Sequence, residues 1–267
     1  IRADGMVFCR MLGSPMPHAR VKNIDISAAK KVKGFLAVLT ADKVPSFPPP
    51  NNPILNNEPR FIGEPILAVA AETEQAAVEA ANLIKLDLEP LPFVIDPLES
   101  LFPRGPDART NGNVANVRLK LQNIKWTAKD FAKAGEDQLP MGKPAEEWQF
   151  GDLDGNFKKA DLIVDETFVT AGYSHHSMEP RSAMAYWRNG KCHVYGSAQS
   201  QSFIIFGLSR YIGIKPTQLV YNGAFCGGGF GSKGGPYAEM SIPAHMSKLL
   251  GGRAVLMRVS RAEEFAI

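Results

Sequence analysis

The sequence predicts a mixed α/β protein of the α+β class, built from many short elements. Of its 267 residues, 24 are Gly and 20 are Pro, and this density of turn-forming residues favours short strands and helices over a helical bundle. Residues 66–89 combine a strand pattern, a helix pattern and a second strand pattern. Hydrophobic residues make up 45% of the chain and charged residues 21%, so we expect a globular protein with a substantial core.

Composition and charge argue against two classes of partner. The net charge is +3, no block of five like charges occurs, and residues 72–99 carry seven acidic residues against Lys85 alone. Nucleic-acid binding requires a clustered basic face, which this pattern does not provide. No run reaches the ~18 consecutive apolar residues that a membrane-spanning helix requires. We therefore expect a soluble chain with no nucleic acid and no membrane among its partners.

The cysteines Cys9, Cys192 and Cys226 lie far apart and form no CxxC pair. This spacing indicates neither a disulfide framework nor a zinc or iron–sulfur site. We expect three reduced, buried thiols in a cytoplasmic protein. Because the chain begins at Ile1 and stops at Ile267 just after a strand-like run, we interpret it as a fragment or a split subunit.

The N-terminal third is expected to contain short strands and one helix. Strands are predicted over residues 6–11, 20–26 and 35–39, followed by a Pro- and Asn-rich surface loop over residues 45–59.

Residues 61–96 give the clearest local pattern. An apolar run over 66–70 is followed by Thr73, a plausible N-cap, and by Glu74, which suits the first turn of a helix. Apolar residues then recur at helical spacing up to Ile84, and residues 84–89 alternate strictly as in a strand. Strand, helix and strand in this order predict a crossover unit.

The pattern weakens between residues 97 and 161, and we expect a domain boundary near residue 110. Trp126 and Trp148 are expected to hold this long connection against the core. Beyond it, strands are predicted over 162–170, 184–187 and 191–195, the last two joined by a hairpin turn at Asn189-Gly190. The remaining predictions are a helix over 199–211, a strand over 219–221, a helix from near Pro243 to Leu250 and a strand over 254–259.

The chemically most informative stretch is the glycine-rich run over residues 222–235, which holds seven glycines. Such a run lets several backbone N–H groups face one point, as binding of a phosphate or an oxyanion requires. Gly229–Gly234 satisfies GxGxxG, but the next strand ends in Arg258 rather than an acid, which disfavours NAD. Ser232 separates Gly231 from Lys233, so the run is not a Walker A loop.

Other polar residues give weaker signals. His175 and His176 point to opposite sides of an extended chain and form a poor metal pair, and Glu179 with Arg181 is compatible with a simple ion pair. His18, His193 and His245 are isolated, and no Ser/His/acid or Cys/His constellation can be assembled from spacing.

Several ordered blocks resemble the molybdenum-binding subunit of the xanthine dehydrogenase/aldehyde oxidase family of molybdenum hydroxylases. The blocks that carry the resemblance are Ser14–Asp25, Gly34–Thr40, Gly63–Glu72, Leu88–Pro92, Asp152–Thr167, His176–Pro180, Ser197–Gln199 and Gly227–Lys233. They cover nearly the whole chain apart from residues 125–149, which resemble an insertion.

The resemblance implies a fold and a set of roles. It implies an α/β-hammerhead domain over residues 1–110, a linker and insertion over 111–150, and the N-terminal part of the molybdopterin-binding domain over 151–267. Gln199 matches the family's glutamine that hydrogen-bonds a molybdenum oxo ligand without binding the metal directly. The segment Gly228, Gly229, Phe230 and Gly231 matches the backbone that holds the cofactor, with Phe230 also near the substrate.

Family chemistry is the hydroxylation of an aldehyde or an N-heterocycle with water as oxygen source, in a multisubunit oxidoreductase. The implied cofactor is a molybdenum-pterin, as a cytosine dinucleotide in a bacterial member. Iron–sulfur clusters and FAD would be carried by partner chains.

This chain departs from the family pattern in two respects. Purine-oxidising members carry a glutamate directly after the loop lysine, where this chain has Gly234, and the family's catalytic glutamate has no match within 267 residues. We therefore expect no catalytic residue in this chain and a partner that carries the glutamate. Two alternatives stay open: a nucleotide-binding oxidoreductase that uses Gly229–Gly234, and a non-catalytic scaffold of the same fold.

Overall fold

The computed structural model describes residues 2–47, 53–110, 112–117, 120–134, 138–142, 146–166, 168, 170, 172 and 174–267. These residues form two compact units. The first comprises Ile1–Phe93, Asn116–Leu121 and Ser174–Ile267, and the second comprises Val94–Ala115 and Gln122–Tyr173.

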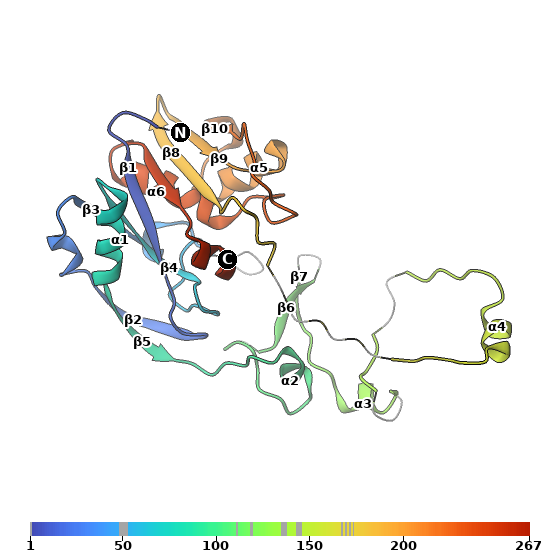
Figure 1. Ribbon diagram of the computed structural model, residues 1–267. Coiled ribbons are helices and arrows are strands. Elements are labelled where there is room, and N and C mark those ends of the chain that lie inside the picture. The colour runs from blue at the N-terminus through green and yellow to red at the C-terminus, as the bar shows by residue number, and fades with distance from the viewer. Residues whose placement is uncertain are drawn as a thin grey trace. The chain divides into compact units, whose positions relative to one another are not determined.

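A seven-stranded sheet forms the centre of the first unit (Figure 1). From one edge to the other its strands are β10 (Leu219–Asn222), β9 (Lys191–Gly196), β8 (Ser182–Arg188), β11 (Val255–Arg258), β1 (Val7–Gly13), β4 (Pro65–Ala71) and β3 (Phe35–Thr40). β1 runs parallel to β11 and β9 parallel to β10, and the other neighbours are antiparallel. Strands from both ends of the sequence therefore share one sheet.

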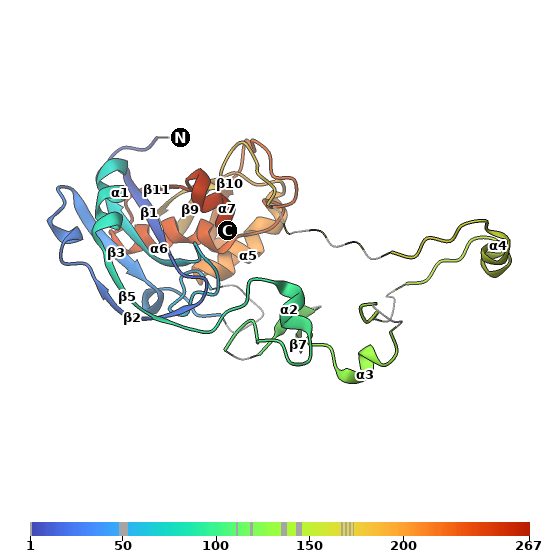
Figure 2. The ribbon, with the colours of Figure 1, turned by 60° about the horizontal axis from the view of Figure 1, so that its bottom comes forward.

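Helices cover both faces of this sheet. Every residue of β4 is buried. Ala68 and Ala70 pack in the cluster that includes α6 (Ile242–Leu249), and Leu67 and Val69 pack in the cluster that includes α1 (Glu74–Leu83). Both helices are labelled in Figure 2. A strand between two helix layers must be apolar on both faces because its side chains alternate. The helix α5 (Gln201–Ile212) packs with α6 over β8 and β9.

Local signals set the termini of several elements. The hydroxyl of Thr73 accepts a hydrogen bond from the N–H of Ala76 at 3.1 Å, which confirms the predicted N-cap of α1. Asn189 and Gly190 have φ values of 51° and 72° in the turn between β8 and β9, which confirms the hairpin. The predicted strands and helices of this unit occur within a few residues of their expected positions.

The predicted crossover unit is wrong. β5 (Lys85–Pro90) does not return to the sheet of β4 but pairs antiparallel with β2 (Ala19–Asp25) in a separate two-stranded sheet. The physical reason lies in its alternation: Leu86 and Leu88 pack against the α1 cluster, while Lys85 and Asp87 are exposed. A strand with one polar face cannot be covered by helices on both sides.

Several short elements complete the first unit. They are the 3-10 helices η1 (Ala29–Lys31), η2 (Ala41–Lys43), η3 (Pro216–Gln218) and η4 (Ala238–Ser241), and the helix α7 (Arg261–Ala266). The helix α7 is not among the elements predicted from the sequence. Its signal is a capping box in which the Ser260 hydroxyl accepts from the Glu263 N–H and the Glu263 carboxylate accepts from the Ser260 N–H.

The second unit contains α2 (Pro97–Leu101), α3 (Ala128–Phe131) and α4 (Leu153–Lys159). The strands β6 (Val114–Val117) and β7 (Lys120–Asn123) pair with each other in a two-stranded sheet. The role expected of the two tryptophans is wrong. Trp126 packs on Phe102 and Phe131 within its own unit, with ring centroids 5.7 Å away in both cases. Trp148 has 89% of its side chain exposed, so it holds nothing against a core.

The strand expected over residues 162–170 is also not observed. In its described part, residues 162–166, 168 and 170, the chain is neither strand nor helix, and Leu162, Ile163 and Val164 are exposed. β-Prone residues form a strand only where a neighbouring strand accepts their hydrogen bonds. Among the helices of the described part of the chain, none is long and apolar enough to span a membrane.

Candidate cofactor site

Two loops leave the same edge of the sheet side by side. β9 and β10 are parallel neighbours in which Tyr195 is paired with Asn222. β9 leads into Gln199, and β10 leads into residues 222–235, called the glycine loop here. Because the carboxyl ends of parallel strands meet at one edge of a sheet, the fold brings Gln199 to the glycine loop.

Gln199 is bound to the end of this loop by three hydrogen bonds. Its Oε1 accepts from the N–H of Gly231 at 3.0 Å and from the N–H of Lys233 at 3.2 Å. Its own N–H donates to the carbonyl of Lys233 at 2.9 Å. Both side-chain bonds use Oε1, so the carboxamide is fixed in orientation. Its Nε2 donates to no residue in the described part of the chain and can serve another acceptor.

The backbone between these contacts carries three consecutive free donors. Among the described residues, no protein acceptor bonds the N–H groups of Gly228, Gly229 and Phe230. Gly229 is a buried residue, and a buried N–H without an acceptor costs ~1–3 kcal/mol. A row of unpaired N–H groups in a glycine-rich loop is the arrangement that binds an anionic group.

Glycine is required at specific positions of the loop. Gly228 and Gly231 have φ values of 101° and 110°, a backbone conformation that residues other than glycine rarely adopt. A Cβ on Gly229 would lie 2.3 Å from the Oε1 of Gln199. Phe230 has a φ of 53° and exposes 74% of its side chain. A non-glycine residue at positive φ with an exposed aromatic ring is typical of a functional site.

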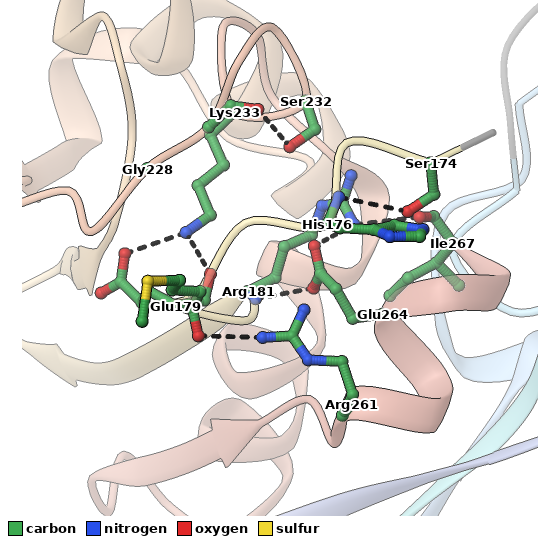
Figure 3. Close-up of polar contacts among 12 residues, drawn as sticks. Ser174, His176, Glu179, Arg181, Gly228, Ser232, Lys233, Arg261, Glu264 and Ile267 are labelled. Carbon is green, nitrogen blue, oxygen red and sulfur yellow. Dashed lines mark hydrogen bonds and ion pairs between the residues drawn. The ribbon is translucent and has the colours of Figure 1, made fainter.

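A buried lysine joins the glycine loop to the segment before β8 (Figure 3). Lys233 is fully buried, and its Nζ donates to the carbonyl of Glu179 at 2.7 Å and to its Oε2 at 2.9 Å. The same Oε2 accepts from the N–H of Gly227 at 2.7 Å. Burial alone would raise the pKa of Glu179, but the hydrogen bonds from Lys233 and Gly227 outweigh burial, so the pKa is lowered.

Glu179 and Arg181 do not form the ion pair with which their spacing is compatible. Arg181 instead bonds Glu264 of α7, with Nη1 and Oε1 2.9 Å apart, and its Nη1 also donates to the carbonyl of Ile267 at 3.0 Å (Figure 3). Residues 178 and 179 form a bend rather than a strand, so Glu179 and Arg181 do not share one face as residues two apart in a strand would. Arg261 of α7 donates to the carbonyl of Met178 at 2.8 Å, so α7 braces the segment that carries Glu179.

His175 lies at the glycine loop, and the three cysteines differ in exposure. The His176 ring packs edge-on to Phe265 at 4.6 Å, and His175 lies beside Gly231. Burial raises the pKa of Cys9 and of Cys192 to about 12. The expectation of three buried thiols is wrong for Cys226, which is exposed in the glycine loop, because the loop backbone itself faces outward there.

One buried hydroxyl at the site lacks a partner. In the described part of the chain, the Oγ of Ser177 forms no hydrogen bond, although the residue is buried. Ser177 packs against Gly228. Sequence reasoning missed the roles of Lys233 and Glu179, which are 54 residues apart and give no local signal.

Comparison with known proteins identifies two domains. A model of the molybdopterin cofactor-binding domain matches residues 136–267, and a model of the a/b hammerhead domain of aldehyde oxidase and xanthine dehydrogenase matches residues 1–92. The chain belongs to the xanthine dehydrogenase/aldehyde oxidase family of molybdenum hydroxylases. The expected mixed α/β fold with a hammerhead domain and a molybdopterin-binding domain is confirmed.

Members of this family in other organisms match most of this chain. The nicotine 6-hydroxylase large subunit of Paenarthrobacter nicotinovorans is 26% identical over 266 residues, which is 94% of this chain and 29% of that protein. The carbon monoxide dehydrogenase large chain of Afipia carboxidovorans is 26% identical over 265 residues, 94% of this chain and 31% of that protein.

A solved structure supports the fold. The structure of quinoline 2-oxidoreductase from Pseudomonas putida 86 has a TM-score of 0.75 and 23% identity, and covers 99% of this chain and 32% of that chain. The chain therefore spans about 30% of the length of these relatives.

Proposed function

We propose that this chain supplies one part of the molybdenum cofactor site of a hydroxylase that oxidises an aldehyde or an N-heterocycle with water as oxygen source. The observation that carries the proposal is the row of free N–H donors at Gly228, Gly229 and Phe230, next to the free Nε2 of Gln199. When bound, a molybdenum-pterin would supply the activation of water and accept electrons.

The residues present fit such a group. A pterin dithiolene is anionic, and the three N–H groups together with the unpaired hydroxyl of Ser177 offer it donors without a competing protein acceptor. Gln199 would donate from Nε2 to the cofactor, and Gly231 would act through Gln199, to which it donates. The exposed ring of Phe230 would line the substrate side.

The finer assignments follow the family and are proposals of the same kind. We propose the cytosine dinucleotide form of the pterin, iron–sulfur and FAD partner chains, a cytoplasmic location, and divisions at 1–110, 111–150 and 151–267. A partner or further segment would supply the catalytic glutamate. Gly234, which stands where purine-oxidising members have a glutamate, argues against a purine substrate. The exposed Trp148, Phe150 and Leu162 offer apolar surface that such a partner would cover.

The proposal is tested on the assembly purified from a host that synthesises the cofactor. Molybdenum, iron and pterin are measured per chain, together with the mass of each co-eluting subunit. We expect Gln199→Ala to lower turnover of aldehydes or N-heterocycles about 10- to 100-fold while most of the molybdenum is retained. The exposed Gln75 of α1 provides the matched control, Gln75→Ala, which should leave both unchanged.

Two results would overturn the proposal. Tight NADP binding by a fully assembled protein without molybdenum would favour the nucleotide-binding alternative at Gly229–Gly234. Stoichiometric binding of partner chains with neither molybdenum nor pterin would favour the scaffold alternative.

A further inference from the structure

We infer that Lys233 and Glu179 are positioning residues that hold the backbone donors of the glycine loop and the carboxamide of Gln199 in a cofactor-binding arrangement. The inference rests on the proposed function and deepens it, because it assigns a task to two residues that do not face the cofactor themselves.

One carboxylate oxygen of Glu179 contacts both ends of the row of free N–H groups. The Oε2 of Glu179 accepts from the N–H of Gly227, where the donor row begins, and from the Nζ of Lys233, just beyond its end. The free N–H groups of residues 228–230 lie between these two attachment points. Fixing both ends of a short glycine segment on one atom limits the conformations that its permissive backbone can adopt.

Lys233 also sets the orientation of Gln199. Its backbone N–H donates to Oε1 of Gln199, and its carbonyl accepts from the N–H of Gln199. Its side chain holds Glu179 at the same time. A single residue thus connects three segments: the one before β8, the one after β9 and the glycine loop (Figure 3 shows the contact between Lys233 and Glu179).

Stability alone does not require this pair. Lys233 has no exposed surface, whereas Glu179 is about a third exposed, and burying an ammonium group carries a desolvation cost that apolar residues of similar volume avoid. Replacing both members by methionine therefore removes the charges without leaving either one unpaired. That double variant separates the positioning task from the stability of the fold.

The experiment compares four forms of the assembled protein: wild type, Lys233→Met, the double variant Glu179→Met/Lys233→Met, and the control Arg60→Met. Arg60 forms an ion pair with the buried Glu64 before β4, so its loss tests the general effect of breaking a partly buried pair. Each form is measured for melting temperature, for molybdenum and pterin retained after dialysis, and for amide hydrogen exchange in residues 227–234.

We expect Lys233→Met to accelerate amide exchange in residues 227–234 and to weaken cofactor retention about 10- to 100-fold. The double variant should recover the melting temperature but neither the slow exchange nor the cofactor. Arg60→Met should leave exchange in the loop and cofactor retention unchanged. If the double variant regains the cofactor together with its melting temperature, the pair is merely structural and the inference is wrong.

A milder variant keeps the inference testable if Lys233→Met does not fold. Glu179→Gln keeps an oxygen acceptor but loses the charge, so faster exchange in residues 227–234 with reduced cofactor retention is expected, and wild-type values for both would overturn the inference. If wild type itself holds no molybdenum, the proposed function fails, whereas the exchange measurement still tests the loop.

Discussion

The substitution Gly229→Ala isolates the close approach between the glycine loop and Gln199. A Cβ at residue 229 would lie 2.3 Å from Oε1 of Gln199, and real Cβ contacts are not shorter than 3.0 Å, so the carboxamide must retreat. The φ of Gly229 is not in the left-handed region, so alanine adds a steric conflict without backbone strain. The effect therefore reports the position of Gln199 alone.

The magnitude follows from the bonds that the movement breaks. Oε1 accepts from Gly231 at 3.0 Å and from Lys233 at 3.2 Å, and each bond is worth about 1 kcal/mol. Alanine also reduces the conformational entropy of the unfolded chain, which stabilises the folded state by ~0.4–1 kcal/mol and offsets part of this loss. The net loss of about 1–2 kcal/mol corresponds to a melting temperature lower by ~2–8 °C. A displacement of Gln199 should also reduce turnover about tenfold or more, as expected for Gln199→Ala.

The same loop offers the matched control. A Cβ on Gly235 meets no atom within 4 Å, and its φ is also outside the left-handed region, so Gly235→Ala should leave stability unchanged or raise it by up to ~1 kcal/mol. Melting temperature by circular dichroism and turnover per bound molybdenum are measured for both variants. Equal values for Gly229→Ala and Gly235→Ala would refute the assigned contact between Gly229 and Gln199.

Three further predictions test other parts of the chain. Thr73→Ala should destabilise the protein by about 1 kcal/mol in denaturant unfolding because α1 loses its N-cap, while Thr73→Ser should be nearly neutral. In the native chain, a thiol reagent at neutral pH should label Cys226 alone. Cys9 and Cys192 should react only after unfolding, because burial raises the pKa of these two thiols to about 12. Rapid labelling of all three cysteines in the native chain would contradict this. Because the pKa of Glu179 is lowered in the folded state, its ionisation should add stability that is fully present above pH 4.5 and is lost as the pH falls through the folded-state pKa. Glu179→Gln should make stability less dependent on pH in this acidic range. An unchanged pH dependence of stability below pH 4.5 would disprove the contribution.

The sequence by itself determined the local elements and the family. The N-cap at Thr73, the Asn189-Gly190 turn and the apolar run of β4 are recognisable because neighbouring residues make the contacts that define them. The glycine-rich run and Gln199 were identified as the candidate site from their order along the chain and their resemblance to a family.

Only the tertiary structure decided which distant residues meet. Glu179 pairs with Lys233, 54 residues away, and Arg181 pairs with Glu264, 83 residues away. β5 leaves the central sheet, and the β-prone residues 162–166 stay unpaired, because a strand depends on the neighbour that accepts its hydrogen bonds as much as on its own residues. Local patterns carry no information on such long-range partners, whose choice follows from burial and charge in the folded chain.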